Sequence, residues 1–573
     1  MNKEVGIALL ISFFLLAPPV SGVSEGEIDV LHYDLDIQLF PDEHKFNISV
    51  MVEILATEDG VTDVEFSFNE DLQIDAILSE GAVLAYERRG NNLIVLFDSP
   101  LRKNEEVQLI FVYEGIADKV PELGESIWGY IGTVGSYMIY ESSWYPIIWG
   151  DRATAIISMK VPDGHTGITL GELLLTTSDG KCTEFVYEVD TPTGGISFAA
   201  GEYATKSTFF GHIPVMIYAY PDDIWGSELA LAKSKDILRF YSETFGEYPY
   251  ESLKIVEIPD YFMGGHGDQG MIMLYSNVFK KEQDIGFLAH EIAHNWWGAQ
   301  VSAVGEQSLR SSEGFGIFSK NMNHDLPERK DHNLWIIEGF ATYSSIMYTE
   351  HTGGKGAMID YLKNTRGEYL GKIETQPDEP IISAEEEYGR SGVYHAVVYS
   401  KGALVLHMLR YVVGDETFFL IMNTFAESYG GRSATVHDFQ TVAEDVSGRN
   451  LGWFFDEWVR ETTLPDYAIG EVSITKTQDY EVNFNVYQKG DLAKMPVDIT
   501  LHSAKSQVTK RFWIDENTEA VTITTSSKPL YIEIDKDGWL LESERSNNVH
   551  VISYPKNMAG FKLLLKEFGR RLN

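Results

Sequence analysis

The residues best suited to chemistry stand in the middle of the chain, in the stretch His290-Glu291-Ile292-Ala293-His294. On a helix, residues four apart share a face, so both imidazoles can reach one metal ion. Glu291 then points to the neighbouring side of the same turn, where it can act as a base on a water molecule instead of binding the metal. The alternative is a pair of packed core histidines beside a chance glutamate, a pattern that composition alone rarely produces. We therefore predict a metal centre with His290 and His294 as ligands.

A catalytic zinc ion needs a third protein ligand and one open position, and two glutamates are candidates. Glu338 is surrounded by apolar residues, which predict a helix over 334–350 that packs against the histidine helix. Glu313 is followed by a polar stretch and by Pro327, which is typical of a surface loop. We therefore expect Glu338 to be the ligand and keep Glu313 as the alternative.

The elements that must position these residues follow from the spacing of the apolar side chains. From about 28 to 207 apolar and polar residues alternate, which predicts strands with one buried face. From about 228 the period changes toward that of a helix. We expect helices near 228–245, 284–297, 334–350, 357–370, 395–413 and 437–446. After Leu464-Pro465 the alternation returns, which predicts a small β-sandwich to about 541.

This order of elements predicts a multidomain α+β protein. We expect an N-terminal β-rich domain over 23–207, an α-rich catalytic domain over 208–464 and a C-terminal β-sandwich over 465–541. The tail, 542–573, carries basic residues and an apolar stripe that predict a short amphipathic helix. We expect this helix either to dock on the acidic body of the protein or to contact a membrane surface.

The first 22 residues have the pattern of a secretory signal. Lys3 precedes an apolar run over 5–17, and small residues follow at 20–22. The run is shorter than the 20 or so apolar residues that a spanning helix needs. We expect an exported protein, in the extracellular space or at the cell surface, with a retained anchor as the alternative.

Composition excludes several classes of protein. The chain has 45 basic and 86 acidic side chains, a formal net charge of −41, which argues against nucleic acid as the main partner. Cys182 is the only cysteine, so intramolecular disulfides, thiolate-rich zinc sites and iron–sulfur clusters are excluded. With 44% hydrophobic residues, the chain is not a disordered acidic one.

Two longer segments extend the metal pattern: His290-Glu291-x-x-His294-Asn295-Trp296-Trp297-Gly298 and Trp335-x-x-Glu338-Gly339-Phe340-Ala341. They resemble the gluzincin aminopeptidases, the family of aminopeptidase N and leukotriene hydrolase, and the similarity covers roughly 25–540. The resemblance implies a thermolysin-like catalytic domain, one zinc ion and peptide substrates. The family's usual ligand spacing fits Glu313 directly and fits Glu338 if 307–331 is an insertion, while the residues around Glu338 match the family better.

Three further segments are similar to substrate-handling parts of that family. The resemblance of Val398-Tyr399-Ser400-Lys401-Gly402 implies that Tyr399 stabilises the transition state. The family's Gly-x-Met-Glu-Asn strand binds the free amino group of the substrate, but the matching stretch here begins Gly264-Gly265-His266-Gly267-Asp268, with Gly267 where the glutamate is expected. Asp268 is therefore a candidate to supply the carboxylate, and the backbone at Gly264 and Gly265 a candidate to pair with an extended peptide. Glu141 matches a second amine-binding acid of the family; the alternative for Glu141 and Asp268 is a pair of solvated loop acids.

The residues and the resemblance together predict zinc-dependent hydrolysis of peptide bonds, with removal of N-terminal residues from peptides. Glu291 is the expected general base and Tyr399 the expected donor to the oxyanion. The altered strand at Gly267 motivates an alternative, an endopeptidase or a hydrolase of non-peptide substrates on the same scaffold. A non-catalytic binding protein is a further alternative, which the presence of Glu291 and Tyr399 disfavours.

Overall fold

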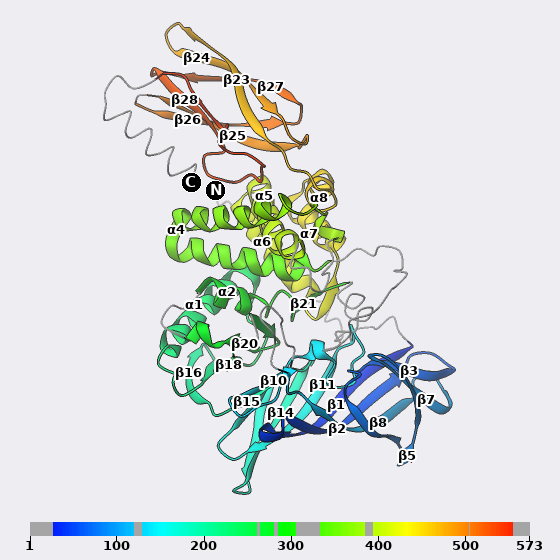
Figure 1. Ribbon diagram of the computed structural model, residues 1–573. Helices are drawn as coiled ribbons and strands as arrows, with labels where there is room; N and C mark the ends of the chain where they lie inside the picture. Colours follow the sequence, from blue (N-terminus) through cyan, green and yellow to red (C-terminus); the bar gives the residue numbers. More distant parts are fainter. Residues whose placement is uncertain are drawn as a thin grey trace, which may run out of the picture.

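The computed structural model describes residues 27–119, 129–259, 264–279, 285–304, 333–383, 393–503 and 505–553. The predicted signal at 1–22, Glu313 and the predicted C-terminal amphipathic helix lie outside these residues. Figure 1 shows the N-terminal strands at one end of the molecule, the helices in the middle and the C-terminal sheets at the other end. The predicted multidomain α+β layout is thereby confirmed.

The described part of the N-terminal region contains three sheets. The largest has the order β13 (Glu172–Ser178), β14 (Cys182–Thr193), β11 (Ala153–Pro162), β1 (Ile28–Phe40), β2 (Lys45–Ala56), β8 (Glu106–Ile116), β4 (Gln73–Ser79) and β5 (Ala82–Val83). The other two are β3 (Val61–Ser67), β7 (Asn92–Leu101) and β6 (Ala85–Arg89), and β12 (Thr166–Thr169), β15 (Phe198–Gly201), β10 (Ser136–Met138) and β9 (Gly129–Tyr130). Every second residue of β2 is buried, as the alternation predicts.

A five-stranded sheet joins this region to the helices. Its order is β16 (Ala204–Phe210), β17 (Ile213–Ala219), β18 (Leu253–Ile258), β20 (Met271–Tyr275) and β19 (Gly265–Asp268). Along β20, Ile272 and Leu274 belong to the core shared with the helices, whereas Met271 and Met273 belong to the N-terminal core. The sheet is thus covered on both faces, which explains why every residue of β18 and every residue of β20 except Tyr275 is buried. The edge strand β19, which runs antiparallel to β20, is left beside the helices that carry the metal motif.

The helices are α1 (Ser227–Phe245), α2 (Ile285–Ala293), α4 (Trp335–Ile373), α5 (Gly402–Val413), α6 (Asp415–Tyr429), α7 (Val436–Ser447) and α8 (Gly452–Trp458), with a π-helix, η5 (His395–Lys401), leading into α5. Two predicted helices, 334–350 and 357–370, are one element interrupted at Gly354, whose φ of 73° is non-helical. The stretch His395–Val413 is long and apolar enough to cross a membrane, but it is 94% buried inside the protein, as a core helix is.

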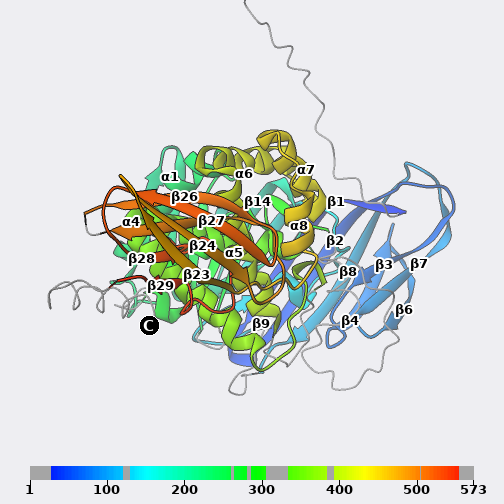
Figure 2. The same ribbon diagram turned by 90° about the horizontal axis from the view of Figure 1, so that it is seen from above.

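The C-terminal region is a sandwich of two sheets, β23 (Tyr467–Lys476), β24 (Tyr480–Gln488) and β27 (Thr518–Thr525), and β26 (Gln507–Ile514), β25 (Met495–Ser503), β28 (Pro529–Ile534) and β29 (Val549–Val551). In the view from above, these sheets lie over the helices, while β3, β6 and β7 extend to one side (Figure 2). The helices and the sandwich share one continuous core. β16 crosses the predicted boundary at 207 and 208, and β29 follows 541; the predicted domain boundaries stay predictions.

Candidate active site

Helix α2 carries the first part of the motif. Leu288 and Ile292 are buried and anchor the helix in the core, which leaves His290 and Glu291 on its other faces. The helix ends at Ala293, and His294 follows in a tighter turn in which its N–H donates to the Glu291 carbonyl at 3.3 Å. The prediction of a helix over 284–297 is therefore too long by one turn, yet both imidazoles still face the same side.

Three ligand atoms meet beside α2. The nearest donor atoms of His290, His294 and Glu338 all lie within 4.8 Å of one another. Glu338 Oε2 is 3.3 Å from His290 Nε2 and 3.5 Å from His294 Nε2. The same oxygen is buried and has no hydrogen-bond partner among the described residues. Two nitrogens and one carboxylate oxygen converging in this way fit a zinc ion with an open fourth position.

The surroundings prepare these side chains for metal binding. His294 Nδ1 lies 2.9 Å from the Trp297 carbonyl, which can only accept, so Nδ1 donates and Nε2 keeps its lone pair. Thr342 Oγ1 lies 3.4 Å from His290 Nδ1. Burial acts to raise the pKa of Glu338, but His294 and His290 outweigh it and hold that pKa at about 2. The carboxylate is therefore kept in the charged form that a metal needs.

Glu291 lies next to the three ligands and is buried. Burial raises its pKa to about 7, with His294 acting to lower it and Glu338 to raise it. The edge strand β19 lies directly against this carboxylate, because a Cβ on Gly265 would come within 2.5 Å of Glu291 Oε1. Glycine at 265 is thus required for the close approach of strand and helix.

A buried amide fixes the strand to the helix. Asn295 Oδ1 accepts hydrogen bonds from the Gly270 N–H and from the Tyr248 hydroxyl, each at 3.0 Å. Gly270 forms the turn between β19 and β20 with a φ of 71°. Asn295 therefore ties the substrate-side turn to the segment that carries His294, a role that the sequence analysis did not assign to it.

Tyr399 reaches the site from η5. Its ring stacks on His290 with the centroids 5.9 Å apart, and its hydroxyl acts to lower the pKa of Glu338. A π-helix widens one turn and often marks a functional site. Here two glycines allow η5 to lie against α4: a Cβ on Gly339 would come within 3.0 Å of the Val398 carbonyl, and one on Gly402 within 3.3 Å of Gly339 Cα. The pairs Glu338-Gly339 and Lys401-Gly402, which are distant in sequence, therefore lie side by side in the fold.

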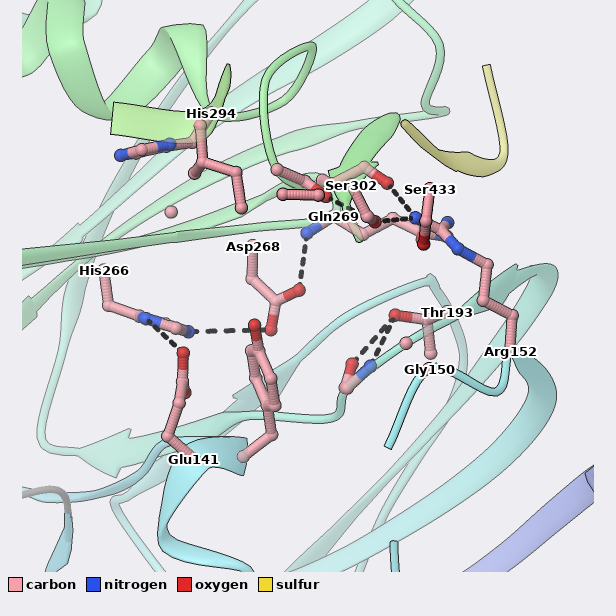
Figure 3. Close-up of a pocket in the computed structure, with 18 of the residues that line it drawn as sticks. Glu141, Gly150, Arg152, Thr193, His266, Asp268, Gln269, His294, Ser302 and Ser433 are labelled. Carbon is pink, nitrogen blue, oxygen red and sulfur yellow. Dashed lines mark hydrogen bonds and ion pairs between the residues drawn. The ribbon is translucent and has the colours of Figure 1, made fainter. Parts of the chain in front are cut away.

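The position of the expected amine-binding glutamate has no room for a side chain. A Cβ on Gly267 would come within 2.6 Å of His294 Cβ and 2.9 Å of the Glu291 carbonyl. The side chains of His266 and Asp268 point the other way and meet Glu141 from the short turn Tyr140–Ser142 (Figure 3). His266 Nδ1 lies 3.9 Å from Glu141 Oε1, and Nε2 lies 3.8 Å from Asp268 Oδ2.

This acidic pair changes the chemistry of His266. Burial acts to lower the pKa of the imidazole, but Glu141 and Asp268 outweigh it, so the pKa is raised. Glu141 and Asp268 are among the residues expected from sequence to lie near the substrate, whereas His266 is not. A single histidine between two glycines gives no periodic signal, and Glu141 is distant from it in sequence. Only the fold brings His266, Asp268 and Glu141 together.

One cavity connects these groups. It is lined by Glu141, Gly265, Asp268, Glu291, His294 and Glu338, and it continues past Gln269 to Arg152 and Ser433. Of the other predicted residues, His290 and Tyr399 adjoin Glu338, and the Gly264 carbonyl accepts a hydrogen bond from the Tyr275 N–H at 3.4 Å at the start of β19. Glu313 lies outside the described residues.

Comparison with known proteins agrees with this geometry. The Peptidase family M1 domain matches residues 229–331 and 329–458. Probable aminopeptidase 1 of Sulfurisphaera tokodaii is 24% identical over 76% of this chain and 54% of its own length. Puromycin-sensitive aminopeptidase of Caenorhabditis elegans is 22% identical over 65% of this chain and 39% of its own length. The chain thus spans about half the length of these relatives or less.

Solved structures share the fold. An M1 zinc metallopeptidase from Deinococcus radiodurans superposes with a TM-score of 0.61 at 19% identity, covering 78% of this chain and 97% of that one. Aminopeptidase A of Legionella pneumophila in complex with aspartic acid gives a TM-score of 0.72 at 16% identity over 95% of this chain and 62% of that one. In its ligand triad, in the matched domain over residues 229–458 and in its fold, this chain is similar to the aminopeptidase N-like zinc gluzincins of peptidase family M1.

Proposed function

We propose that this protein is a zinc-dependent aminopeptidase that removes N-terminal residues from peptides. The observation that carries the proposal is the meeting of the His290, His294 and Glu338 ligand atoms within 4.8 Å, beside the buried carboxylate of Glu291. The aminopeptidases that share the M1 domain support it. The acidic pair Glu141 and Asp268 lines the same cavity and suits the ammonium group of a free peptide N-terminus.

In this proposal the zinc ion, when bound, polarises the scissile carbonyl and makes water easier to ionise. Glu291 accepts the proton of the attacking water and later passes it to the leaving amine. The hydroxyl of Tyr399 donates a hydrogen bond to the oxygen on which negative charge develops, an interaction that is stronger in the transition state than in the ground state. The exposed edge of β19, from Gly265 onward, pairs with the backbone of an extended peptide.

Because Gly267 has no carboxylate, other residues have to bind the free amino group of the substrate. The carboxylates of Glu141 and Asp268 flank His266 at 3.9 and 3.8 Å, so a substrate ammonium competes with the imidazole for the same two acids. We propose that Glu141 and Asp268 hold the ammonium in place of the missing glutamate.

Gly267 also favours a second candidate function, cleavage without a free N-terminus. The cavity does not end at the acidic pair but continues to Arg152 and Ser433, which leaves space beyond the amine position. An endopeptidase or a hydrolase of non-peptide substrates would use the same metal centre, whereas a binding protein would have no use for Glu291 and Tyr399 in these positions.

A matched set of substrates separates these functions. The zinc-loaded protein is assayed on aminoacyl-coumarins with a free and with an acetylated amino group. An aminopeptidase cleaves the free forms at least about a hundredfold faster, because the acetyl group removes the charge that Glu141 and Asp268 bind. Equal rates on both forms contradict the proposal and favour the endopeptidase, and zinc binding without any turnover favours a binding protein.

Export is part of the proposal. The apolar run over 5–17 supports it. N-terminal sequencing of the protein recovered from the medium or the cell surface of an expressing host tests it: a protein that stays in the cytoplasm with residues 1–22 attached contradicts export.

A further inference from the structure

Arg152 stands at the end of the cavity that the metal centre and the acidic pair do not occupy. It precedes β11 and lines the same cavity as Glu291 and His294. Figure 3 shows its guanidinium beside Ser302 and Ser433, on the far side of the pocket from His266 and Glu141. The cavity thus has a positively charged side chain at one end and acidic side chains at the other. A positively charged side chain in a cavity is notable in a chain of net charge −41.

Only neutral groups hold the guanidinium in place. Arg152 Nη2 donates to the Ala299 carbonyl at 2.8 Å and to Ser302 Oγ at 2.6 Å. Ser302 Oγ in turn donates to the Gly298 carbonyl at 3.0 Å. Within the described ranges, no carboxylate pairs with Arg152, and neither Nη1 nor Nε has a hydrogen-bond partner. The side chain is therefore fixed in orientation while part of its donor fork stays available.

The adjacent aspartate does not neutralise it. The Asp151 carboxylate is buried and accepts from the Val30 N–H at 2.6 Å and from the Arg152 N–H at 2.9 Å, so it is bound to the main chain and not to the guanidinium. Burial raises the pKa of Asp151 to about 7, with the backbone donors acting to lower it and Asp29 to raise it. Near neutral pH Asp151 is thus only partly ionised, and its carboxylate forms no ion pair with the Arg152 guanidinium among the described contacts.

We propose that Arg152 binds a carboxylate of the substrate and makes the enzyme selective for peptides that carry one. This inference rests on the proposed aminopeptidase function: the ammonium group binds at Glu141 and Asp268, and the carboxylate binds at the opposite end of the same cavity. An arginine fork that meets a carboxylate in a partly desolvated site forms charge-assisted hydrogen bonds of the stronger kind.

Such a carboxylate can come from two parts of a peptide. It is either the acidic side chain of the first residue or the free carboxyl end of a very short peptide. Glutamyl-coumarin against glutaminyl-coumarin isolates the first source, because the two substrates differ by one charge at nearly equal shape. Alanyl-alanine against alanyl-alanine amide isolates the second.

The decisive experiment compares wild type with Arg152→Gln on both pairs. We expect wild type to prefer one acidic member by about tenfold or more in kcat/KM, and Arg152→Gln to lose that preference while its kcat/KM on the neutral member changes by less than about threefold. The pair that loses its preference identifies the source. If Arg152→Gln lowers the kcat/KM of all four substrates equally, or of none, the inference is wrong and the aminopeptidase proposal still stands.

Two controls separate recognition from general effects. Arg89→Gln removes the same charge from a side chain that is 70% exposed on the N-terminal sheets, so it should leave every preference unchanged. Arg152→Lys keeps the charge but loses the fork, so we expect it to keep only part of the preference. Because Arg152 also holds the segment at Ala299 and Ser302, circular dichroism and zinc content are measured for each variant.

A binding measurement gives the answer even without turnover. The zinc-loaded wild type is titrated calorimetrically with L-glutamate and L-glutamine and, in the Glu291→Gln variant, with alanyl-alanine and its amide. Tighter binding of the acidic member of either pair, by about tenfold, supports the inference. Equal affinities within both pairs overturn it, whether or not the Arg152 variants fold and whether or not the protein hydrolyses peptides.

Discussion

Gly267 lies against His294 so closely that a Cβ at position 267 would come within 2.6 Å of His294 Cβ. The strand β19 therefore lies closer to the segment of His294 than a side chain at position 267 would allow. The departure from the Gly-x-Met-Glu-Asn pattern is thus built into the packing, and it accompanies the displacement of the acidic groups to Glu141 and Asp268 on the other face of β19.

A side chain at 267 is expected to damage the metal centre instead of restoring amine binding. Gly267→Ala and Gly267→Glu have to push back the segment of His294 or the Glu291 carbonyl, so we expect lower zinc content and a loss of about a hundredfold in kcat/KM. Gly371→Ala is the matched control: it lies in α4 with nothing within 4 Å of the added Cβ, and should stabilise the protein by about 0.5–1 kcal/mol with unchanged activity. Improved activity of Gly267→Glu on free-amine substrates would contradict the packing argument.

The third ligand is tested by zinc content. Glu338→Ala removes the carboxylate whose Oε2 lies 3.3 and 3.5 Å from the two imidazoles, so the purified variant should contain far less than one zinc per chain. Glu313→Ala should retain its zinc. Mass spectrometry of the metal in both variants, before and after dialysis against a chelator, gives the answer, and the reverse pattern would assign the ligand to Glu313. Added zinc should restore activity to the dialysed wild type but not to Glu338→Ala.

Tyr399 should affect the rate of reaction more than substrate or metal binding. Tyr399→Phe keeps the ring that stacks on His290 and removes only the hydroxyl, so we expect kcat to fall by about 10²–10³-fold with KM and zinc content nearly unchanged. Tyr429→Phe is the control, because its hydroxyl donates to Asp438 at 3.0 Å away from the cavity. A rise in KM with unchanged kcat would instead place Tyr399 in ground-state binding.

The two histidine ligands could be predicted from sequence because their relation is local. His290 and His294 share a face by helical period alone. Glu338 could be preferred to Glu313 because the apolar residues around it require a buried helix, and α4 is that helix. The layers of the fold were predictable for the same reason, since alternation and helical period follow from which side chains are buried.

The rest of the site depends on contacts between residues distant in sequence. Gly339 and Gly402 lie so close together that a Cβ on Gly402 would come within 3.3 Å of Gly339 Cα, and this close approach, which brings Tyr399 to Glu338, is not visible in any sequence periodicity. His266 is placed between Glu141 and Asp268, and Arg152 reaches the cavity from the residue before β11 in the N-terminal region. Residues such as His266 and Arg152 reach the cavity only because the five-stranded sheet packs against the N-terminal region on one face and against the helices on the other.

Lys254 carries a buried amine at the contact between that sheet and the N-terminal region. Its Nζ donates to the Thr169 carbonyl at 2.6 Å and to the Gly171 carbonyl, and it lies 4.5 Å from the centre of the Tyr187 ring. Burial lowers its pKa from the ordinary 10.5 to about 7, with Glu172 acting to raise it. A neutral amine has two N–H groups, which is enough for the two carbonyls.

This shift predicts that Lys254 stabilises the protein more at alkaline pH. Between pH 7 and 10.5 the unfolded chain binds a proton at Lys254 that the folded chain does not bind, so the free energy of unfolding rises with pH over this window, by at most about 1.4 kcal/mol per pH unit. Urea denaturation of wild type and Lys254→Met at pH 7, 8.5 and 10 measures the effect: the difference in stability between the two proteins should shift in favour of wild type as the pH rises. Lys103→Met, at an exposed position, should give a difference that does not change with pH. A constant difference for Lys254→Met would mean that its amine stays charged and that the contact between the two regions tolerates a buried cation.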